Sequence, residues 1–424
     1  MPLSDYQADM ERCSQCTYCE WIPFDQLKSW RFGKGCPSIA YSKFLSYSAR
    51  GRFAVAWSLL KGKSDYTNRL VDIVYKCQTC GSCDVSCKIC RYNLEPLETW
   101  FELRAKLVED GQCLPQHKAI VESLHKEHNA VMENNARRGE WADGLDVKRL
   151  AQEKAEVVFY AGCRFSYDKE LQGITRAAVT LLKGAGVDVG IMGNDEGCCG
   201  GRVFQMGYVK EFSECARRNI EEWEKAGVKK IVTSCSDCYH AFKRLYSSRI
   251  GVSFEVLHTV EFIDQLVKEG KIKFTKKIPM VVTYHDPCHL GRQGEPYVPW
   301  QGKEKKIRNQ IVVYEPRKPR YNGAWGIYEP PRNVLKSIPG IKLVEMERIR
   351  EYSWCCGAGG GVREAYPDFS NWTATERIEE AKATGAEAII SACPWCERNF
   401  IDAINTMGAK MKVLDVAELV RQAM

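Results

Sequence analysis

The chain has 424 residues, which is enough for two or three domains with cores of their own. Hydrophobic residues make up 45% of it, yet no apolar run reaches the roughly 18 residues of a membrane span. The formal charge of +7 counts 21 cysteines as neutral and comes without an arginine-rich tract with interleaved aromatics, so we exclude a nucleic-acid-binding protein. The N-terminal residues lack a secretory pattern, and cysteines in such number then predict reduced, metal-binding thiols in the cytoplasm instead of a disulfide framework.

Residues 1–115 contain two cysteine triples, each with spacings of two residues. A more distant cysteine accompanies each triple: Cys36, followed by Pro37, and Cys87. Such paired triples are typical of two-cluster ferredoxins, in which the fourth ligand is exchanged between the two runs. The pattern therefore predicts two [4Fe–4S] cubane clusters, one held by Cys13, Cys16, Cys19 and Cys87, the other by Cys77, Cys80, Cys83 and Cys36.

This N-terminal region departs from the ferredoxin pattern in two places. Sixteen residues (20 to 35) separate Cys19 from Cys36 where three are usual, and Lys88 occupies the position that normally holds proline. Cys90 is the alternative to Cys87 as a ligand. A zinc ribbon is disfavoured, because zinc motifs do not normally use two such triples. Apolar residues at helical spacing in 49–60 and 94–108 predict a mostly helical ferredoxin-like domain.

Residues 116–153 are charged and helical in pattern, so we predict a helical connector on the surface. His117, His125 and His128 have no cysteine at ligand spacing, and we expect them to be solvated.

The first of two repeats is predicted at 154–272. Strand patterns at 157–160, 187–191 and 230–233 alternate with helix patterns at 171–186 and 209–226. This alternation predicts an α/β domain with a parallel sheet, whose sites form at the carboxyl ends of the strands. Cys163 should lie in the loop after the first strand, and Cys235 to Cys238 at the mouth of a helix.

The second repeat, at 273–424, has the same predicted order. Its elements are strands at 280–284, 341–344 and 388–391 and helices at 332–337 and 373–384. One spacing differs: 66 residues separate Cys288 from Cys355, whereas 34 separate Cys163 from Cys198. The excess of 32 residues lies at about 293–325, a segment rich in Pro, Lys and Arg. We interpret it as an insertion that is a docking arm for a partner subunit, a lid, or a solvated excursion; its Tyr297 and Trp300 suit a protein interface.

The two repeats share one frame of five cysteines. The sets are Cys163, Cys198, Cys199, Cys235 and Cys238, and Cys288, Cys355, Cys356, Cys393 and Cys396. In each set a Cys-Cys-Gly sequence precedes a Cys-x-x-Cys pair, and the adjacent cysteines are separated from that pair by 35 residues in the first set (200 to 234) and 36 in the second (357 to 392). Adjacent cysteines suit a structural zinc site poorly, and five thiolates exceed what a cubane takes. The frame therefore indicates a multi-iron cluster in each repeat.

With both frames and the N-terminal triples, the chain resembles the catalytic subunits of heterodisulfide reductase, in particular the D-type subunit, in which a ferredoxin-like part is fused to paired CCG domains. The resemblance covers nearly the whole chain. It implies that each five-cysteine set holds a noncubane [4Fe–4S] cluster and is catalytic, and that a disulfide substrate is cleaved between the two. The substrate is not implied, because one fold serves several complexes.

Two functions follow. The leading hypothesis is an iron–sulfur oxidoreductase subunit that reduces a disulfide-type substrate, and the alternative is an electron-transfer subunit of a large anaerobic complex, such as those associated with benzoyl-CoA reductase. Both require partner subunits containing flavin, ferredoxin or cytochrome, and membrane association only through a partner. His240, His285, Asp286 and His289 are candidate proton donors or cluster-tuning groups, with packing as their alternative role. Of the unassigned cysteines, Cys113 and Cys215 are expected to be buried structural thiols.

Overall fold

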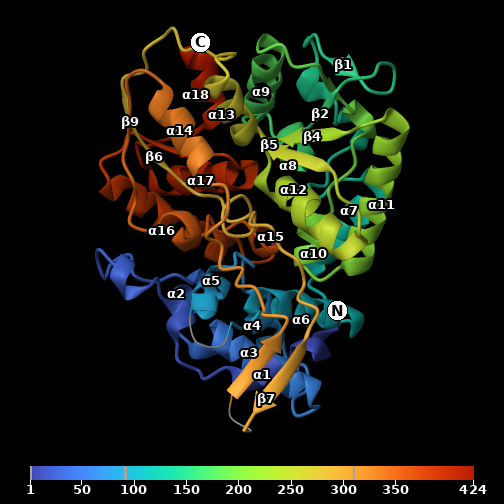
Figure 1. Cartoon of the computed structure of the whole chain (residues 1–424), viewed down its shortest axis with the longest axis vertical. Helices are drawn as coiled ribbons and strands as arrows, with labels where there is room; N and C mark the ends of the chain where they lie inside the picture. Colours follow the sequence, from blue (N-terminus) through green and yellow to red (C-terminus); the bar gives the residue numbers. More distant parts are fainter. Residues whose placement is uncertain (1, 90–92, 309–310) are drawn as a thin grey trace.

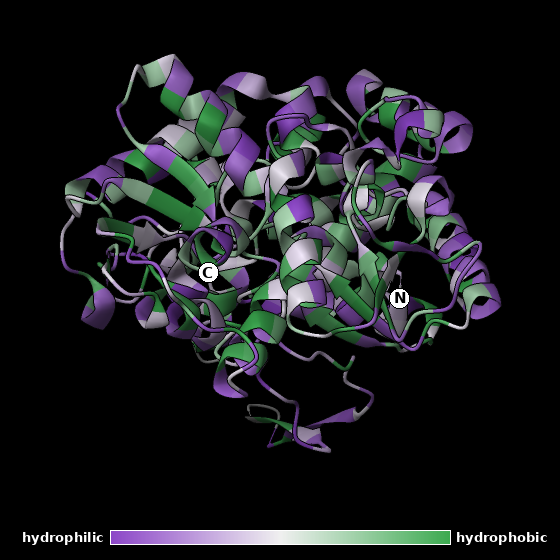
Figure 2. Cartoon of the chain, turned by 90° about the horizontal axis from the view of Figure 1, so that it is seen from above, coloured by the Kyte–Doolittle hydropathy of each residue, from purple (hydrophilic) through white to green (hydrophobic). Residues whose placement is uncertain are grey.

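The computed structural model describes residues 2–89, 93–308 and 311–424. It has a helical N-terminal lobe and two α/β repeats, with the repeats side by side and the helical lobe against both of them (Figure 1). Apolar residues concentrate on the central strands, and hydrophilic residues on the outer helices (Figure 2). The predicted mixed architecture, with a mostly helical N-terminal part and two repeats that each contain a parallel sheet, is confirmed.

The N-terminal lobe is helical because its apolar residues recur at helical spacing and its turns carry local start signals. Pro37 and Pro96 stand in the first turns of their helices, where proline costs no hydrogen bond. The Ser48 side chain caps the predicted helix at 49–60. The helices are α1 (Gln7–Arg12), α2 (Pro37–Ser42), α3 (Ala49–Leu60), α4 (Asn68–Tyr75), α5 (Ser82–Ile89) and α6 (Pro96–Glu109).

The segment 116–153 is more than a surface connector. Its helix α7 (Pro115–Glu127) presents His117 to the second repeat, where the ring nitrogen Nε2 lies 3.1 Å from the Gly361 carbonyl oxygen. His117 is fully buried and His128 is half-buried, so the expectation of solvated histidines is wrong for both and holds for His125. The sequence suggested a solvated His117 because its neighbours in the chain are charged, but His117 lies on the buried face of α7.

The first repeat is built on a parallel sheet of order β1-β3-β2-β4-β5. Its strands are β1 (Lys148–Arg149), β2 (Val157–Tyr160), β3 (Val189–Ile191), β4 (Lys230–Thr233) and β5 (Glu255–His258). The main covering helices are α9 (Gln172–Gly184), α11 (Val209–Ala226) and α13 (Thr259–Lys268). Strands β2 and β4 and helix α11 lie where the sequence predicts, because their β-branched runs and helical spacing are unambiguous.

The second repeat has a parallel sheet of order β11-β10-β6-β9. The strands are β6 (Met280–Tyr284), β9 (Ile341–Leu343), β10 (Ala388–Ser391) and β11 (Lys412–Asp415), and the helices include α14 (Glu329–Ser337), α16 (Pro367–Ala383), α17 (Pro394–Met407) and α18 (Val416–Ala423). Strand pairings β9-β6-β10-β11 match β3-β2-β4-β5 of the first repeat, so the duplication of the cysteine frame is also a duplication of topology.

The insertion forms an antiparallel hairpin, β7 (Lys303–Ile307) and β8 (Ile311–Glu315), which the sequence did not predict. It leaves the second repeat and runs down alongside the N-terminal lobe (Figure 1). Arg12 Nη1 donates to the Tyr314 hydroxyl at 3.0 Å, and Lys318 Nζ lies 3.2 Å from a Glu95 carboxylate oxygen. These contacts attach the hairpin to the helical lobe.

One buried side chain, Arg104 of α6, joins the three parts of the molecule. Within the N-terminal lobe, its Nη2 donates to three carbonyl oxygens, the shortest at 2.6 Å to Cys77. Its Nη1 donates to the carbonyl of Gln205 in the first repeat at 2.8 Å and to that of Gly360 in the second at 2.9 Å. Arg104 therefore fixes the helical lobe against both repeats.

Candidate iron–sulfur sites

The structure brings together the four cysteines predicted for the first cubane. Cys13, Cys16, Cys19 and Cys87 line one pocket, although up to 73 residues of chain (14 to 86) separate them. Cys16 is exposed and the other three are half-buried, so this site is at the molecular surface. Cys90, the alternative ligand, lies outside the described residues. The assignment of these four as ligands stays a prediction.

The cysteines predicted for the second cubane lie deeper. Cys36 precedes α2, and Cys80 and Cys83 lie just before and within α5. Burial, assisted by the neighbouring Cys80 and Cys77, raises the pKa of the Cys36 thiol to about 12. Burial likewise raises the pKa of Cys83 well above its ordinary value, with Cys36 and Cys77 adding to the effect. These four thiols therefore form one group, in which Cys36 and Cys80 are buried and Cys77 and Cys83 are half-buried.

The first five-cysteine set gathers at the carboxyl ends of β2 and β4. Cys163 lies in the first turn of α8 (Gly162–Tyr167), a short helix where the sequence predicted a loop, and Cys235 precedes α12 (Ser236–His240). The thiols are neighbours in the order Cys163, Cys198, Cys199, Cys238, Cys235. The adjacent thiols of Cys198 and Cys238 lower the pKa of Cys199 to about 6.

The second set repeats this arrangement at the ends of β6 and β10. Its thiols are neighbours in the order Cys288, Cys355, Cys356, Cys396, Cys393. A nitrogen of His285 and the sulfurs of Cys356 and Cys396 all lie within 4.8 Å of one another. His285 receives a hydrogen bond from Arg377 Nε at 3.0 Å, so its orientation is fixed.

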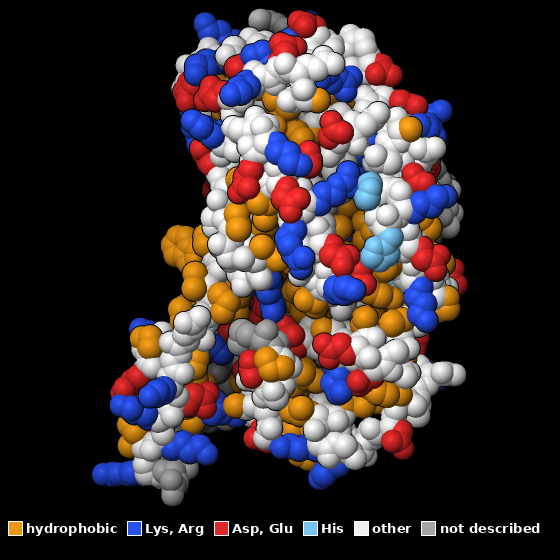
Figure 3. Space-filling view, turned by 90° about the vertical axis from the view of Figure 1, so that its right-hand side faces the viewer, with side chains coloured by type: hydrophobic (Ala, Val, Ile, Leu, Met, Phe, Trp, Pro, Cys, Tyr) orange, Lys and Arg blue, Asp and Glu red, His pale blue; other side chains and the backbone are white. Residues whose placement is uncertain are grey.

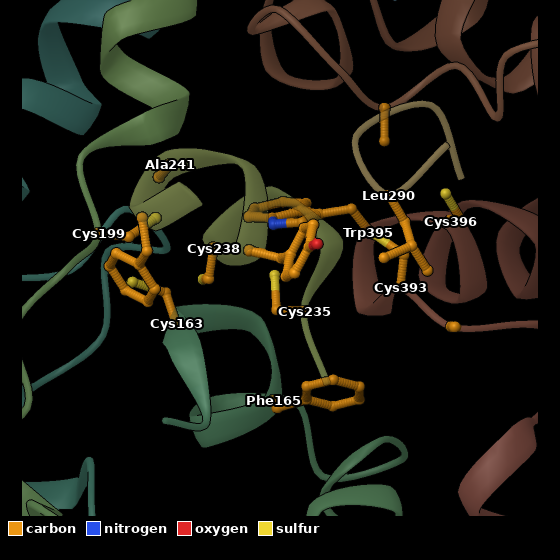
Figure 4. Packing of buried hydrophobic residues seen from close by; sticks show 14 of the residues in the cluster. Cys163, Phe165, Cys199, Cys235, Cys238, Ala241, Leu290, Cys393, Trp395 and Cys396 are labelled. Carbon is orange, nitrogen blue, oxygen red and sulfur yellow. The ribbon is translucent and has the colours of Figure 1, made fainter. Parts of the chain in front are cut away.

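The two five-cysteine sets face each other across the boundary between the repeats (Figure 4). Cys235 of the first set and Cys393 of the second are close enough for each thiol to shift the pKa of the other. On the other side, Cys80 of the N-terminal lobe lies beside Cys355, whose thiol is the main reason that the pKa of Cys80 falls to about 6. A continuous series of thiols thus leads from the N-terminal lobe through the second repeat to the first.

The backbone around these thiols fits iron–sulfur clusters. The ten cysteines of the repeats are free thiols, and they converge in two groups. Gly200 and Gly357, which follow the paired cysteines, have φ of +76° and +96°, conformations that favour glycine. A Cβ at Gly162 would lie 2.8 Å from the Cys238 sulfur. Soft thiolates with this small-residue backbone are the ligands that such clusters select.

Arg138 is a residue near the site that sequence reasoning missed. Its Nη1 and Nη2 lie 3.6 and 3.7 Å from the Cys163 sulfur, and Nη2 also donates to Glu196 at 2.9 Å. Glu196 in turn accepts the backbone N–H groups of Ala161 and Gly162. A lone arginine 25 residues before a cysteine gives no sequence signal, because only the fold brings the two together.

The four candidate polar groups around the sets have different roles. Asp286 forms a buried bidentate ion pair with Arg332, at 2.6 and 2.9 Å, which is a packing role. His289 forms an ion pair with Asp237 of the first repeat and stacks on His240, with ring centroids 4.7 Å apart. Asp237 and these two histidines therefore link the repeats beside the cysteines.

Trp395, between the two cysteines of the second Cys-x-x-Cys pair, extends from the second repeat towards the first (Figure 4). Arg202 and Arg164 of the first repeat lie over its ring, 3.9 and 4.4 Å from the centroid. Trp395 is only 6% exposed, so an indole in contact with two guanidinium groups fills space at the boundary between the two sets.

Cys113 and Cys215 are half-buried, not buried as expected. Cys215 lines a surface pocket with Cys198, His125 and His128, so one edge of the first five-cysteine set is close to solvent. Cys113 lies away from the sets, with its sulfur 3.9 Å from the Val108 carbonyl oxygen.

Comparison with protein families supports this description. A 4Fe-4S dicluster domain matches residues 9–89, and a cysteine-rich domain, CCG, matches residues 157–243 and 318–401. The second CCG match begins after Cys288, because the insertion separates this cysteine from the rest of its set.

Several relatives match the chain along most of its length. It is 34% identical to the D-type subunit of the dihydromethanophenazine:CoB–CoM heterodisulfide reductase of Methanosarcina mazei, with 98% of this chain and 94% of the relative covered. The probable iron-sulfur-binding oxidoreductase FadF of Bacillus subtilis is 32% identical over 82% of this chain and 46% of its own length. The EtfAB:quinone oxidoreductase of Syntrophomonas wolfei is 29% identical over 83% and 47%.

A solved structure shares the fold. It is a hypothetical protein from Helicobacter pylori, with a TM-score of 0.56 and 11% identity, covering 89% of this chain and 68% of that one.

The fold and its cysteine sets define an iron–sulfur oxidoreductase with two cubane [4Fe–4S] clusters in the helical lobe and noncubane [4Fe–4S] clusters in the CCG repeats. More particularly, the chain belongs to the family of D-type heterodisulfide reductase subunits. In the described ranges, none of the helices combines the length and the apolar character needed to cross a membrane.

Proposed function

We propose that this chain receives electrons at its N-terminal cysteine sets and reduces a disulfide-type substrate at the two five-cysteine sets. The observation that carries the proposal is the series of thiol contacts, from Cys80 to Cys355 and from Cys393 to Cys235. Clusters held by these residues would be neighbours, so single electrons would reach both repeats.

The need for two five-cysteine sets follows from the chemistry. Cubane clusters pass one electron at a time, whereas cleaving a disulfide takes two. Two sets in contact across the repeat boundary supply a thiol-binding position for each half of the substrate, so neither half has to leave as a radical. His289 and His240, buried together beside Cys288 and Cys238, are positioned to hydrogen-bond a departing thiolate.

The electrons must come from a partner, and we propose a redox subunit containing flavin, ferredoxin or cytochrome in a cytoplasmic complex. The relative from Methanosarcina mazei is named as one subunit of a larger reductase. Cys16, the exposed cysteine of the first N-terminal set, marks the side from which such a partner would deliver electrons.

The second candidate is electron relay without a disulfide substrate, and Trp395 favours it. The indole and its two flanking arginines fill space between the sets in which a substrate would have to bind. Two relatives, FadF and the EtfAB:quinone oxidoreductase, carry oxidoreductase names that mention no disulfide.

Electron paramagnetic resonance of anaerobically purified protein distinguishes the two functions. The protein is oxidised with and without candidate thiols and disulfides. Disulfide reduction predicts a new paramagnetic signal that appears with one thiol, is lost in Cys355→Ser, and persists in Cys113→Ser, which changes a half-buried cysteine outside all four sets. Signals that ignore every thiol while the cubane clusters still reduce would contradict disulfide reduction and support relay.

A further inference from the structure

The β7–β8 hairpin gives the surface beside the first N-terminal set an unusual charge. From residue 303 to residue 320 the chain has seven Lys and Arg against two Glu, a net charge of +5 within a protein of net charge +7. All of Lys303–Ile307 is exposed, and so are Arg308, Arg317 and Arg320. The projecting lobe at the lower left of Figure 3 displays lysine and arginine side chains.

Most of these cations have no role in holding the hairpin. The attachment uses Glu304 and Tyr314, both bonded to Arg12, and Lys318, bonded to Glu95 and to the Asn93 carbonyl. Lys305 pairs with Glu315 across the hairpin. We call the remaining group the basic hairpin face: Lys303, Lys306, Arg308, Arg317 and Arg320, for which the described residues supply no anionic partner within 4 Å.

The position of this face relative to the cysteines is fixed. Arg12, the anchor of the hairpin, is the residue next to Cys13, which lines the pocket shared with Cys16, Cys19 and Cys87. Leu45, Gln15 and Arg50 line an adjoining surface hollow. The positive charge therefore stands beside the cysteine pocket that contains the exposed Cys16.

We propose that the basic hairpin face and the rim of the Cys13–Cys16 pocket form the docking surface for a small acidic electron-carrier protein. The inference rests on the proposed function, because it takes the first N-terminal set as the point where electrons arrive. Clustered positive charge attracts an oppositely charged protein at long range and raises its rate of association. Electron transfer needs only a brief encounter, for which charge steering is sufficient without a large apolar interface.

An acidic protein fits this surface better than a lipid bilayer does. Membrane-binding segments combine basic residues with apolar ones that enter the acyl region. In the first strand of the hairpin Ile307, 49% exposed, is the lone large hydrophobic residue, next to charged ones; the exposed Val298 and Trp325 lie outside the two strands, so the described residues form no continuous apolar face on the hairpin. A bilayer would also give no reason for the charge to adjoin the cysteine pocket.

The test measures how fast a reduced plant-type ferredoxin, a small acidic [2Fe–2S] protein, reduces the clusters of the holoprotein in anaerobic stopped flow. The variant is the triple change Lys303→Glu, Lys306→Glu and Arg308→Glu. The control has the same change in net charge on exposed lysines of α7 and α11: Lys118→Glu, Lys126→Glu and Lys210→Glu. Dithionite, a small reductant that needs no docking, measures whether the clusters of each protein are intact.

At low salt, the second-order rate with ferredoxin should fall about tenfold or more in the hairpin variant and less than twofold in the control. The difference should shrink as salt screens the charges. Equal rates in the hairpin variant and the wild type, or an equal loss in both variants, would overturn the docking surface. The proposal would also be overturned if the hairpin variant kept its rate with ferredoxin but no longer sedimented with phosphatidylserine vesicles. If dithionite itself fails to reduce clusters in the wild type, the proposed function fails instead.

Discussion

Lys88, which replaces the usual proline after Cys87, supports the N-terminal lobe through a buried ion-pair network. Its Nζ lies 2.7 Å from a carboxylate oxygen of Asp84 and 2.7 Å from one of Glu95, and its side chain is 1% exposed. Burial favours the neutral amine, but the two carboxylates outweigh it and hold the pKa of Lys88 above its ordinary value. The ammonium group is therefore charged and compensated at neutral pH.

Lys88→Met should destabilise the lobe strongly, because it leaves two buried carboxylates without their shared cation. Removing one partner of a buried ion pair costs about 3–5 kcal/mol. Glu95 keeps Lys318 at 3.2 Å, so we expect the lower end, about 3 kcal/mol. For a lobe of this size within a larger protein, such a loss lowers the unfolding temperature by about 5–10 °C.

The matched control is Lys106→Met, which removes a lysine 2.8 Å from Asp110 in a pair where both side chains are 34% exposed. Exposed pairs are worth about 0–1 kcal/mol, so this variant should stay close to the wild type. Thermal unfolding of anaerobic holoprotein, followed by circular dichroism, measures both. In Lys88→Met/Asp84→Asn part of the loss should return. If the two lysine variants unfold at the same temperature, the reasoning about buried compensation is wrong.

Three further outcomes are expected. Arg138→Met should lower the reduction potential of one noncubane cluster, because it removes a cation beside the Cys163 sulfur. Arg137→Met changes an exposed neighbouring arginine and should leave that potential unchanged. Redox titrations that give the same potential for both variants would refute this prediction. Burial lowers the pKa of His117 to about 4 in the folded protein. The neutral imidazole therefore contributes its full stability to the fold above the unfolded-state pKa of about 6.5, and this contribution is lost as the pH falls towards 4. Between pH 7 and pH 5, the free energy of unfolding of His117→Gln should therefore fall by about 2 kcal/mol less than that of the wild type. If the two free energies fall in parallel with pH, the prediction is wrong. Trp395→Ala should open the boundary between the repeats, so a disulfide reductase would gain access for bulkier disulfides in a steady-state assay, and no change with any disulfide would favour relay.

Much of this architecture follows from local sequence patterns. Strands such as β4 and β10 are short apolar runs bounded by turn residues, and the duplicated cysteine frame predicted two sheets of equal topology. The strands β5 and β11 were not predicted. Each lies at the edge of its sheet and mixes polar and apolar residues, and it becomes a strand only because it pairs with β4 or β10.

Only the cysteines of the site could be predicted from the sequence, because their motifs occur twice in the chain. Spacing and glycine neighbours identify the cysteines, and their grouping agrees with the predicted sets, whose ligand roles stay predictions. Arg138 and Trp395 were not identified as parts of the site, because their importance comes from contacts over long sequence separations: Arg138 with Cys163, and Trp395 with Arg164 and Arg202. The two strands of the hairpin were not predicted either, since the charged first strand lacks alternation of polar and apolar residues.

Arg104 has a consequence for how the protein is allowed to move. One fully buried guanidinium is bonded to carbonyl groups of the helical lobe and of both repeats, and a rotation of any lobe would strand several of these carbonyls in the interior. The distances between the cysteine sets are then held constant. Any control over the flow of electrons has to act at the ends of the path, where carriers dock and substrates bind, and not by opening and closing the middle.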